Sequence, residues 1–123
     1  MRFSEALSSG GFSIRAYAPG LIQVGERRFE QSLVVMPHRL LEDWPPRRPE
    51  DLTPEHLDLV LELEPEIILL GTGASLVFPD PACQARAARL RVGVEVMDTG
   101  AACRTYNILM AEGRRVAAAL LPP

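Results

Sequence analysis

Two short segments hold the residues whose types and spacing could do chemistry. The first is IILLGTGASLVFPD, residues 67–80, in which an apolar run ends in Gly71-Thr72-Gly73 and leads to Phe78-Pro79. A glycine-rich turn after a buried strand can present backbone amides to an anion. The segment matches neither G-x-G-x-x-G nor G-x-x-x-x-G-K-[ST]. We therefore weigh a ligand-binding turn against a tight turn whose glycines supply unusual backbone angles, and favour the tight turn.

The second segment is MDTGAACRTYN, residues 97–107. Asp98 and Thr99 follow an apolar run and can cap the helix expected to start there. Cys103 then falls in the early turns of that helix, where the dipole favours a thiolate. The alternative is that Cys103 packs as a small hydrophobic side chain. No base stands at a recognisable spacing from it, so no nucleophile is predicted.

Arg104 and Asn107 are three residues apart and project from a similar face of the same predicted helix. If that face meets the turn over 71–79, Arg104 could bind a carboxylate or a phosphate. If it does not, we expect Arg104 to pair with a nearby acidic side chain. The choice depends on a distance that the sequence does not contain.

The other reactive side chains are few and widely spaced. There are two cysteines, Cys83 and Cys103, and they form no C-x-x-C pair. There are two histidines, His38 and His56, and their spacing from each other and from the cysteines is not that of metal ligands. All thirteen basic residues are arginine, which leaves no lysine for a Schiff base or a phosphate-binding loop. We therefore expect no catalytic residue, no metal site and no cofactor.

The bulk composition is that of a single globular domain. The chain has 123 residues, of which 47% are hydrophobic and 24% charged, enough to bury one core without disulfides or metals. A net charge of -3 disfavours nucleic acid as a partner, because such domains usually carry a basic stripe. The start, MRFSEALSSGGF, lacks the apolar core of a signal peptide, and no window reaches the ~18 apolar residues of a membrane span. We expect a soluble cytoplasmic protein with one domain over 1–123 and a flexible N-terminus over 1–10.

The elements that must position these residues fall into two halves. The first third, FSIRAYAPGLIQVGERRFEQSLVVMP, holds apolar runs separated by turn residues and is predicted to form an antiparallel meander. Pro19-Gly20 suits a type II turn within it. The run from Ser32 to Met36 is more continuously apolar, so we expect it to lie deeper in the protein.

A proline-rich and charged segment, PHRLLEDWPPRRPEDLTPEHL, follows over residues 37–57. Proline fits neither the interior of a strand ladder nor that of a helix, so a surface excursion is predicted. The segment carries Trp44 beside Pro45-Pro46. We favour a buried tryptophan that anchors a long loop, but an exposed Trp-Pro patch would mark a partner site. Trp44 is therefore kept as a binding candidate.

Helices and strands alternate in the second half. Thr53-Pro54 and Asp80-Pro81 each supply a capping side chain followed by proline, which suits the first helical position. The third helix, after Asp98, is expected to end at Gly113. The runs EIILLG, VGVEV and RRVAAALL are predicted strands, and right-handed crossovers would make them parallel neighbours. The predicted class is α/β, with a parallel core preceded by the meander.

Four stretches carry a resemblance to a known family: PEIILLGTG (65–73), FP (78–79), GVEVMDTGAACRTYNILMAEGRRVAAALLP (93–122) and the opening YAPGLIQVGERRFEQSLVV. In this order and spacing the chain resembles a poorly characterised small-domain family. The family includes mitochondrial respiratory complex I assembly factor 3 and many short bacterial proteins. The resemblance covers about residues 10–122. It implies a three-layer α/β single domain with a central mixed, largely parallel sheet, covering helices and an additional β layer.

The resemblance brings no catalytic residues with it. The positions that match the family are binding candidates only: Gly71, Thr72, Gly73, Phe78, Pro79, Asp98, Thr99, Cys103, Thr105 and Asn107. The mitochondrial member acts as an assembly chaperone for complex I through protein partners. The resemblance therefore favours a non-enzymatic protein-binding or assembly factor linked to a respiratory complex.

Two other hypotheses remain open. One is a small-ligand or anion-binding domain with a pocket at the Gly71–Pro79 turn and Arg104, which requires these groups to share a concave site. The other is redox sensing through Cys103, which requires an exposed and reactive thiol. We rank redox sensing last.

Overall fold

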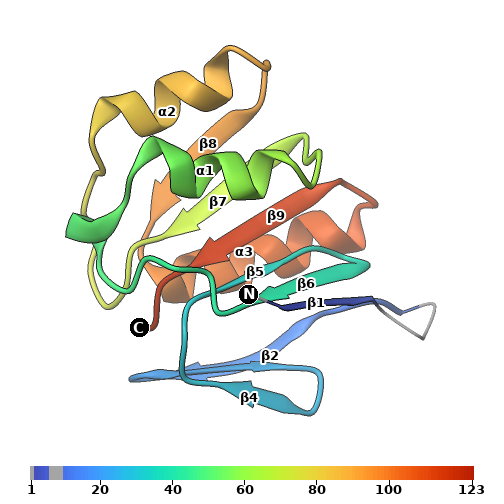
Figure 1. The fold of residues 1–123 in the computed structure, drawn as a ribbon. Coiled ribbons are helices and arrows are strands. Elements are labelled where there is room, and N and C mark those ends of the chain that lie inside the picture. Colours follow the sequence, from blue (N-terminus) through green and yellow to red (C-terminus); the bar gives the residue numbers. More distant parts are fainter. Residues whose placement is uncertain (1, 6–9) are drawn as a thin grey trace.

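A six-stranded mixed sheet forms the middle of the molecule (Figure 1). The computed structural model describes residues 2–5 and 10–123. The strand order is β1-β6-β5-β9-β7-β8, with the bounds β1 Arg2–Glu5, β5 Leu33–Val35, β6 Arg39–Glu42, β7 Ile67–Gly71, β8 Gly93–Met97 and β9 Val116–Leu120. β7 pairs in parallel with β8 and β9, whereas the other pairings in this sheet are antiparallel. The α/β class with a mixed central sheet is confirmed, and parallel pairing is confined to the three C-terminal strands.

Two helices cover one face of this sheet, α1 (Pro54–Leu61) and α2 (Pro81–Ala88), with a short 3₁₀ turn at Pro49–Asp51 before them (Figure 1). Both helices begin at the proline that the sequence predicts, and Asp80 Oδ1 accepts the amide of Ala82 at 2.8 Å as the cap of α2. Apolar side chains of both helices pack with one side of the sheet in a single cluster. This face is the first outer layer.

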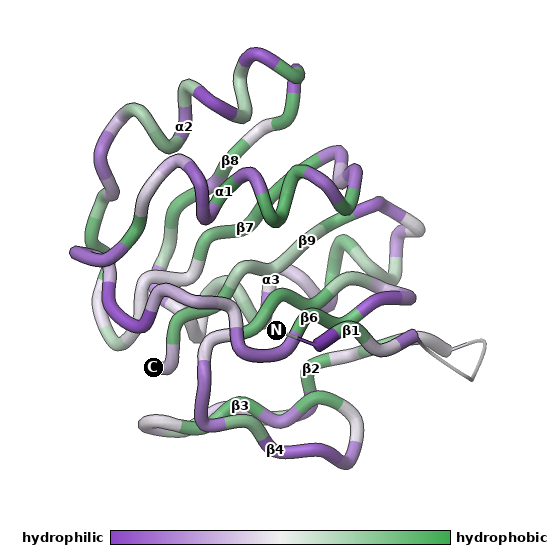
Figure 2. The backbone as a smooth tube through the Cα atoms, in the orientation of Figure 1, coloured by the Kyte–Doolittle hydropathy of each residue, from purple (hydrophilic) through white to green (hydrophobic). Residues whose placement is uncertain are grey.

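The opposite face carries α3 (Thr99–Ala111) and a separate antiparallel sheet made of β2 (Ile14–Ala18), β3 (Leu21–Val24) and β4 (Arg27–Phe29). Buried residues of α3, of this small sheet and of β7 and β9 form a second cluster. The strands β5, β7 and β9 between the two clusters are hydrophobic along their length (Figure 2), because both of their faces are covered. The three layers that the resemblance implies are confirmed.

Three N-terminal segments differ from the prediction. The run from Ser32 to Met36 is buried as expected, but it leaves the meander and joins the central sheet as β5. The predicted surface excursion contains strand β6, whose Leu40 and Leu41 are buried; its prolines flank the strand and do not interrupt it. Part of the predicted flexible N-terminus pairs with β6 as strand β1. The rest of that prediction includes residues 1 and 6–9, which lie outside the described ranges.

The register across the sheet brings distant segments of the chain together. Gly71 at the end of β7 lies opposite Leu120 at the end of β9 and opposite Met97 at the end of β8. The glycine turn, the start of α3 and the C-terminal residues 121–123 therefore meet at one end of the sheet. The turn from β5 to β6 and the segments that enter β7 and β9 meet at the other end.

Candidate functional site

The glycines of the turn after β7 are required by packing and by backbone geometry. A Cβ on Gly71 would lie 3.0 Å from the Cα of Thr99, because the first turn of α3 sits directly against this position. Gly73 adopts a φ of +100°, which residues with a side chain rarely occupy. The interpretation of Gly71-Thr72-Gly73 as a tight turn agrees with this geometry.

The backbone amides of the turn are used within the protein. Thr72 N–H donates to the carbonyl of Met97 at 2.9 Å, and Gly73 N–H donates to Oγ1 of Thr99 at 2.8 Å. The same Thr99 hydroxyl donates to the carbonyl of Leu121 at 2.7 Å. Thr99 is completely buried, so its hydroxyl joins the turn, the helix and the C-terminal end of β9. An anion would have to break these bonds to use these two amides.

Thr72 fixes the loop that follows. Its buried side-chain oxygen donates to the carbonyl of Ser75 at 2.7 Å and accepts the amide of Val77 at 3.1 Å. The loop held in this way turns three consecutive apolar side chains to solvent, with exposed fractions of 50% for Leu76, 38% for Val77 and 70% for Phe78. Pro79 is buried and leads into α2. We call residues 76–78 the apolar loop patch.

The structure brings Gly73, Asp98 and Arg104 to one shallow hollow of about 350 Å³ beside Tyr17. Each of the three groups already has an internal partner. Asp98 Oδ1 accepts the amide of Ala101 at 2.8 Å as the cap of α3. Arg104 donates to the Tyr17 hydroxyl, and its guanidinium lies 5.9 Å from the centre of the Tyr17 ring. The arginine does face the turn, but its nearest partner is an aromatic ring and not an acidic side chain.

The neighbouring residues of α3 attach the small sheet. The side-chain amide of Asn107 donates to the carbonyl of Ile14 at 2.7 Å and accepts the Ile14 amide at 2.9 Å. The hydroxyl of Tyr106 donates to the carbonyl of Phe12 at 2.6 Å, and burial raises the pKa of this phenol. Thr105 is half-buried. Asn107 therefore has a structural task that accounts for its polar atoms.

Cys103 is buried in the core beneath α3. Burial raises the pKa of its thiol to about 12, and the opposing charge of Arg104 does not compensate. Of the two alternatives for Cys103, packing as a small hydrophobic side chain agrees with this burial, because desolvation disfavours the charged thiolate. Cys83 is buried as well, and its pKa is also raised by burial.

Trp44 is buried at the end of β6. Its indole N–H donates to the carbonyl of His56 at 3.2 Å, and its ring meets the His56 ring edge-on with centroids 6.4 Å apart. The interpretation as a loop anchor is confirmed. An exposed Trp-Pro patch is not formed.

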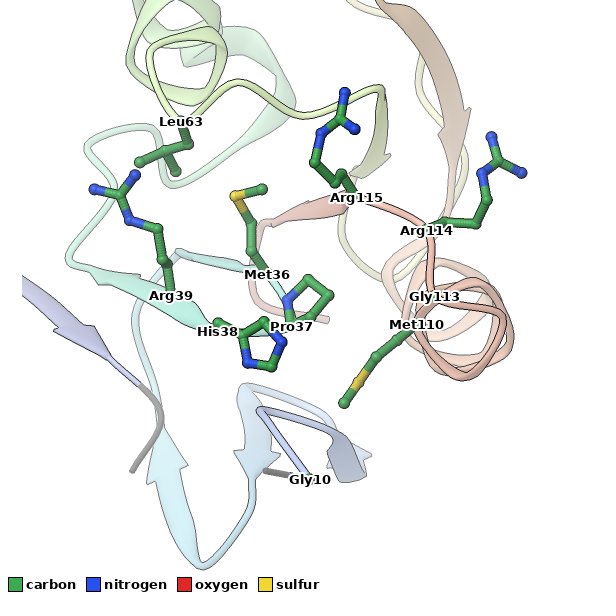
Figure 3. A pocket seen from close by; sticks show the side chains of 10 residues that line it. All are labelled: Gly10, Met36, Pro37, His38, Arg39, Leu63, Met110, Gly113, Arg114 and Arg115. Carbon is green, nitrogen blue, oxygen red and sulfur yellow. The ribbon is translucent and has the colours of Figure 1, made fainter. Parts of the chain in front are cut away.

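A second hollow, of about 380 Å³, opens at the other end of the sheet (Figure 3). It is lined by the β5–β6 turn, by Leu63 before β7, and by the segment between α3 and β9. No pattern in the sequence predicts this hollow. Its residues are spread over separate segments with no motif, and the Arg114-Arg115 pair before the last strand is the only local signal of unusual charge there.

Two kinds of site are missing from the part of the chain that the structure describes. Within residues 2–5 and 10–123, no three His, Cys, Asp or Glu side chains are grouped so that they could hold a metal ion. No helix in the same ranges is long and apolar enough to cross a membrane.

Comparison with known proteins places the fold among relatives. The sequence pattern of a family described as protein of unknown function (DUF498/DUF598) matches residues 14–121. A protein of Danio rerio named NADH dehydrogenase (ubiquinone) 1 alpha subcomplex assembly factor 3 is 34% identical over 118 residues, which are 94% of this chain and 67% of that protein. The 13 kDa major membrane protein of Francisella tularensis is 36% identical over 72 residues, 58% of each chain. A crystal structure of a Bordetella parapertussis protein is 42% identical with a TM-score of 0.89, and covers 94% of this chain and 99% of that one.

Proposed function

The chain belongs to the family described as protein of unknown function (DUF498/DUF598), and from this membership and its similarity to assembly factor 3 we propose that it is a non-enzymatic protein-binding factor. Its partner is a subunit or a second assembly factor of a respiratory complex, with complex I as the first candidate. The chain spans about two thirds of the zebrafish relative, so this role is a proposal about a shared domain.

The apolar loop patch is the observation that carries the proposal. Three adjacent apolar side chains in solvent are unfavourable unless another surface covers them. The Thr72 and Thr99 hydrogen bonds hold the loop in place before binding, so little conformational entropy is lost when a partner docks. Aromatic side chains are enriched at protein interfaces, so Phe78, the most exposed of the three, is the expected anchor.

Charged side chains lie on one side of the patch, as they do at the rim of an interface. A hollow of about 340 Å³ beside it is lined by Arg47, Arg48 and Glu50 on one side and by residues of the 72–77 loop on the other. Arg48 lies 3.8 Å from Glu50, and both side chains are exposed. A partner that inserts an apolar side chain beside the patch would meet these charges at its edge.

Affinity capture from the organism that encodes the chain tests the proposal. We expect the tagged wild-type chain to retain subunits or assembly factors of a respiratory complex. The double variant Leu76→Ser, Phe78→Ser should retain about tenfold less, since hot-spot side chains dominate binding. The matched control is Leu90→Ser, which alters an apolar side chain of similar exposure, 62%, away from the patch.

Two results would contradict the proposal. One is a wild-type chain that captures nothing above background. The other is equal capture by the double variant and the wild type. A thermal melt of each variant shows that the fold is retained, because exposed substitutions cost little stability.

A second candidate is an anion site at the hollow that joins Gly73, Asp98 and Arg104. It would require Arg104 to leave Tyr17 and turn toward the ligand. A thermal-shift screen against nucleotides and acidic metabolites tests it. A stabilising ligand whose effect disappears in Arg104→Gln would support this site, and the absence of any such ligand would exclude those classes.

The cytoplasm is the compartment that we propose, and the name of the Francisella relative makes this worth testing. Fractionation of the native cells should recover the chain with the soluble proteins. Recovery with the membranes after a high-salt wash would overturn this assignment.

A further inference from the structure

The hollow at the amino ends of β7 and β9 combines an apolar floor with a positively charged rim (Figure 3). It lies at the end of the sheet opposite the apolar loop patch and plays no part in the function proposed above. Its volume of about 380 Å³ falls in the range of small-molecule sites, about 300–1,000 Å³.

The floor is built from sulfur-containing and aliphatic side chains. Met36 and Leu63 are buried beneath the hollow, and Met110 is half-buried at its side. Methionine side chains are flexible and polarizable and adapt to ligands of irregular shape. The floor therefore suits an alkyl chain better than a rigid polar ring.

The rim carries Arg39 on one side of Met36 and Arg115 on the other (Figure 3). His38 also lines the hollow and is exposed. Within the described residues neither arginine makes an ion pair with a carboxylate. The guanidinium carbon of Arg39 lies 5.5 Å from the centre of the Phe3 ring. The Nε of Arg115 donates to the backbone carbonyl of Glu64 at 3.5 Å. No described residue that lines the hollow is acidic. Both guanidinium groups therefore keep donors for a ligand.

The third arginine of the rim is already engaged. Arg114 pairs with Glu66 at 3.0 Å, and the same carboxylate also accepts the backbone amide of Arg115 at 2.9 Å. Bonds to these groups keep the pKa of Glu66 below its ordinary value, so it stays ionised. This pair contributes no net charge to the hollow.

Two helix ends oppose the arginines, since α1 and α3 both finish beside the hollow. Each helix C-terminus corresponds to about half a negative charge, so together they offset about one arginine. The last carbonyls of α3 are moreover bonded by the amides of residues 112–114, including Gly113 to Met110 at 3.0 Å. Arg39 and Arg115 contribute two full charges, so among the residues that line the hollow the positive charge outweighs these helix ends.

We propose that this hollow is a binding site for a small amphipathic anion, an aliphatic carboxylate with an alkyl chain of medium length. The chain lies over Met36, Leu63 and Met110, which removes apolar surface from water. The carboxylate lies between Arg39 and Arg115, because guanidinium donors match the two oxygens of a carboxylate.

Titration of the isotopically labelled protein with octanoate, followed by amide NMR and kept below the micelle-forming concentration, tests the site. We expect saturable shifts confined to the β5–β6 turn, the segment around Leu63 and residues 110–115. Acetate carries the charge without the chain, and octylammonium carries the chain with the opposite charge. Each should bind at least about tenfold more weakly, because one of the two contributions is missing.

Variants separate charge from fold. Arg39→Gln and Arg115→Gln should each lower the affinity for octanoate about tenfold, as expected for the loss of one charge-assisted hydrogen bond. The matched control is Arg89→Gln, which removes the same charge at the end of α2, outside the lining, and should leave binding unchanged. Met110→Glu places a carboxylate at the side of the hollow and should abolish binding. Thermal melts show which variants retain the fold.

Several results would overturn the site. Equal binding of octylammonium would show that charge does not select the ligand. Unchanged affinity in both arginine variants would remove the carboxylate contact. Shifts that do not saturate, or that spread over the whole surface, would show non-specific association. None of these results bears on the capture experiment at the apolar loop patch.

Discussion

At the carboxyl ends of β7 and β9 the polar groups bond one another, whereas at the amino ends of the same strands two arginines face an open hollow. The first end includes the glycine turn, Thr99 at the start of α3, and Glu42. Strand pairing connects Gly71 to Glu42 in one row across the sheet, through Leu120 and Leu33. The second end includes Met36, Arg39 and Arg115. We call them the closed end and the open end.

The comparison shows why strand direction alone does not locate a binding site. Open α/β sheets usually bind ligands at the carboxyl ends of parallel strands. Here a threonine at the start of α3 accepts the amide of Gly73, so the amide that a ligand would need is already bonded. At the open end, Arg39 and Arg115 have no carboxylate partner among the described residues, and only Arg114 is paired, with Glu66. A ligand can bind at an end of the sheet only if the hydrogen-bond donors there are not already bonded within the protein.

The largest expected effect concerns the closed end. Thr99→Val keeps the shape of the side chain but removes the hydroxyl that bonds Gly73 and Leu121. It leaves a buried N–H and a buried C=O without that partner, so we expect the free energy of unfolding to fall by about 3 kcal/mol. Chemical denaturation measures it. Thr105→Val on the same helix is the control and should change stability by less than about 0.5 kcal/mol. Equal effects for both variants would mean that the closed end does not depend on this hydroxyl.

The second largest loss of stability is expected where the small sheet, β2–β4, is attached to α3. Asn107→Leu removes both hydrogen bonds to Ile14, and we expect a loss of about 2 kcal/mol. Amide hydrogen exchange should accelerate in β2–β4 more than in the central sheet. Ile108→Ala, at an exposed neighbouring position, serves as the control. Uniform acceleration over the whole chain would show that the small sheet does not unfold separately.

Glu42 makes the closed end dependent on pH. Burial by itself raises the pKa of Glu42, but hydrogen bonds from Arg2 and Arg27 outweigh it and hold the pKa below its ordinary value of 4.5. A carboxyl with a lower pKa in the folded state stabilises the fold above its unfolded pKa and loses that contribution as the pH falls through the folded pKa. Because both arginines are largely exposed, we expect Glu42→Gln to cost only about 1 kcal/mol at neutral pH. The difference from wild type should shrink toward pH ~3. Denaturation curves of both proteins from neutral pH to pH ~3 measure this difference in the free energy of unfolding. A difference that stays constant over this range would show that the pKa of Glu42 is not lowered in the folded state.

The smallest effect on stability should come from the open end. Arg115→Gln changes a side chain that makes a long hydrogen bond to the carbonyl of Glu64, so the free energy of unfolding should change by less than about 0.5 kcal/mol. The same variant is expected to weaken octanoate. A loss of stability close to that of Thr99→Val would mean that this arginine holds the fold, and the contrast between the two ends would disappear.

Local chemistry in the sequence predicted much of the second half. Asp80-Pro81, Thr53-Pro54 and Gly113 mark helix boundaries because capping and the conformations of proline and glycine act over a few residues. The strand before the glycine turn was also predicted from the sequence, because a continuously apolar run indicates a strand that is covered on both faces. The α/β class followed from these features, whereas the family followed from the resemblance of four stretches in their order and spacing.

The first half was harder because its strands pair with partners far along the chain. β6 lies between prolines and carries charged neighbours, and only its position between β1 and β5 makes it a strand. The candidate site was also predicted only in part, because some of its contacts join segments far apart in the chain. The sequence placed Arg104 on the helix face near the turn, but it could not show that Tyr17, 87 residues away in the chain, is its partner.

The sequence by itself determined where the helices begin, that the runs of β5 and β7 are buried, and to which family the chain belongs, because these depend on neighbouring residues and their order. Only the tertiary structure decided that the amide of Gly73 is bonded by Thr99, that Cys103 is desolvated, and that Arg39 and Arg115 flank one apolar floor. Each of these depends on contacts between segments distant in the chain, whose distances are set by the pairing of strands and the packing of helices on the sheet.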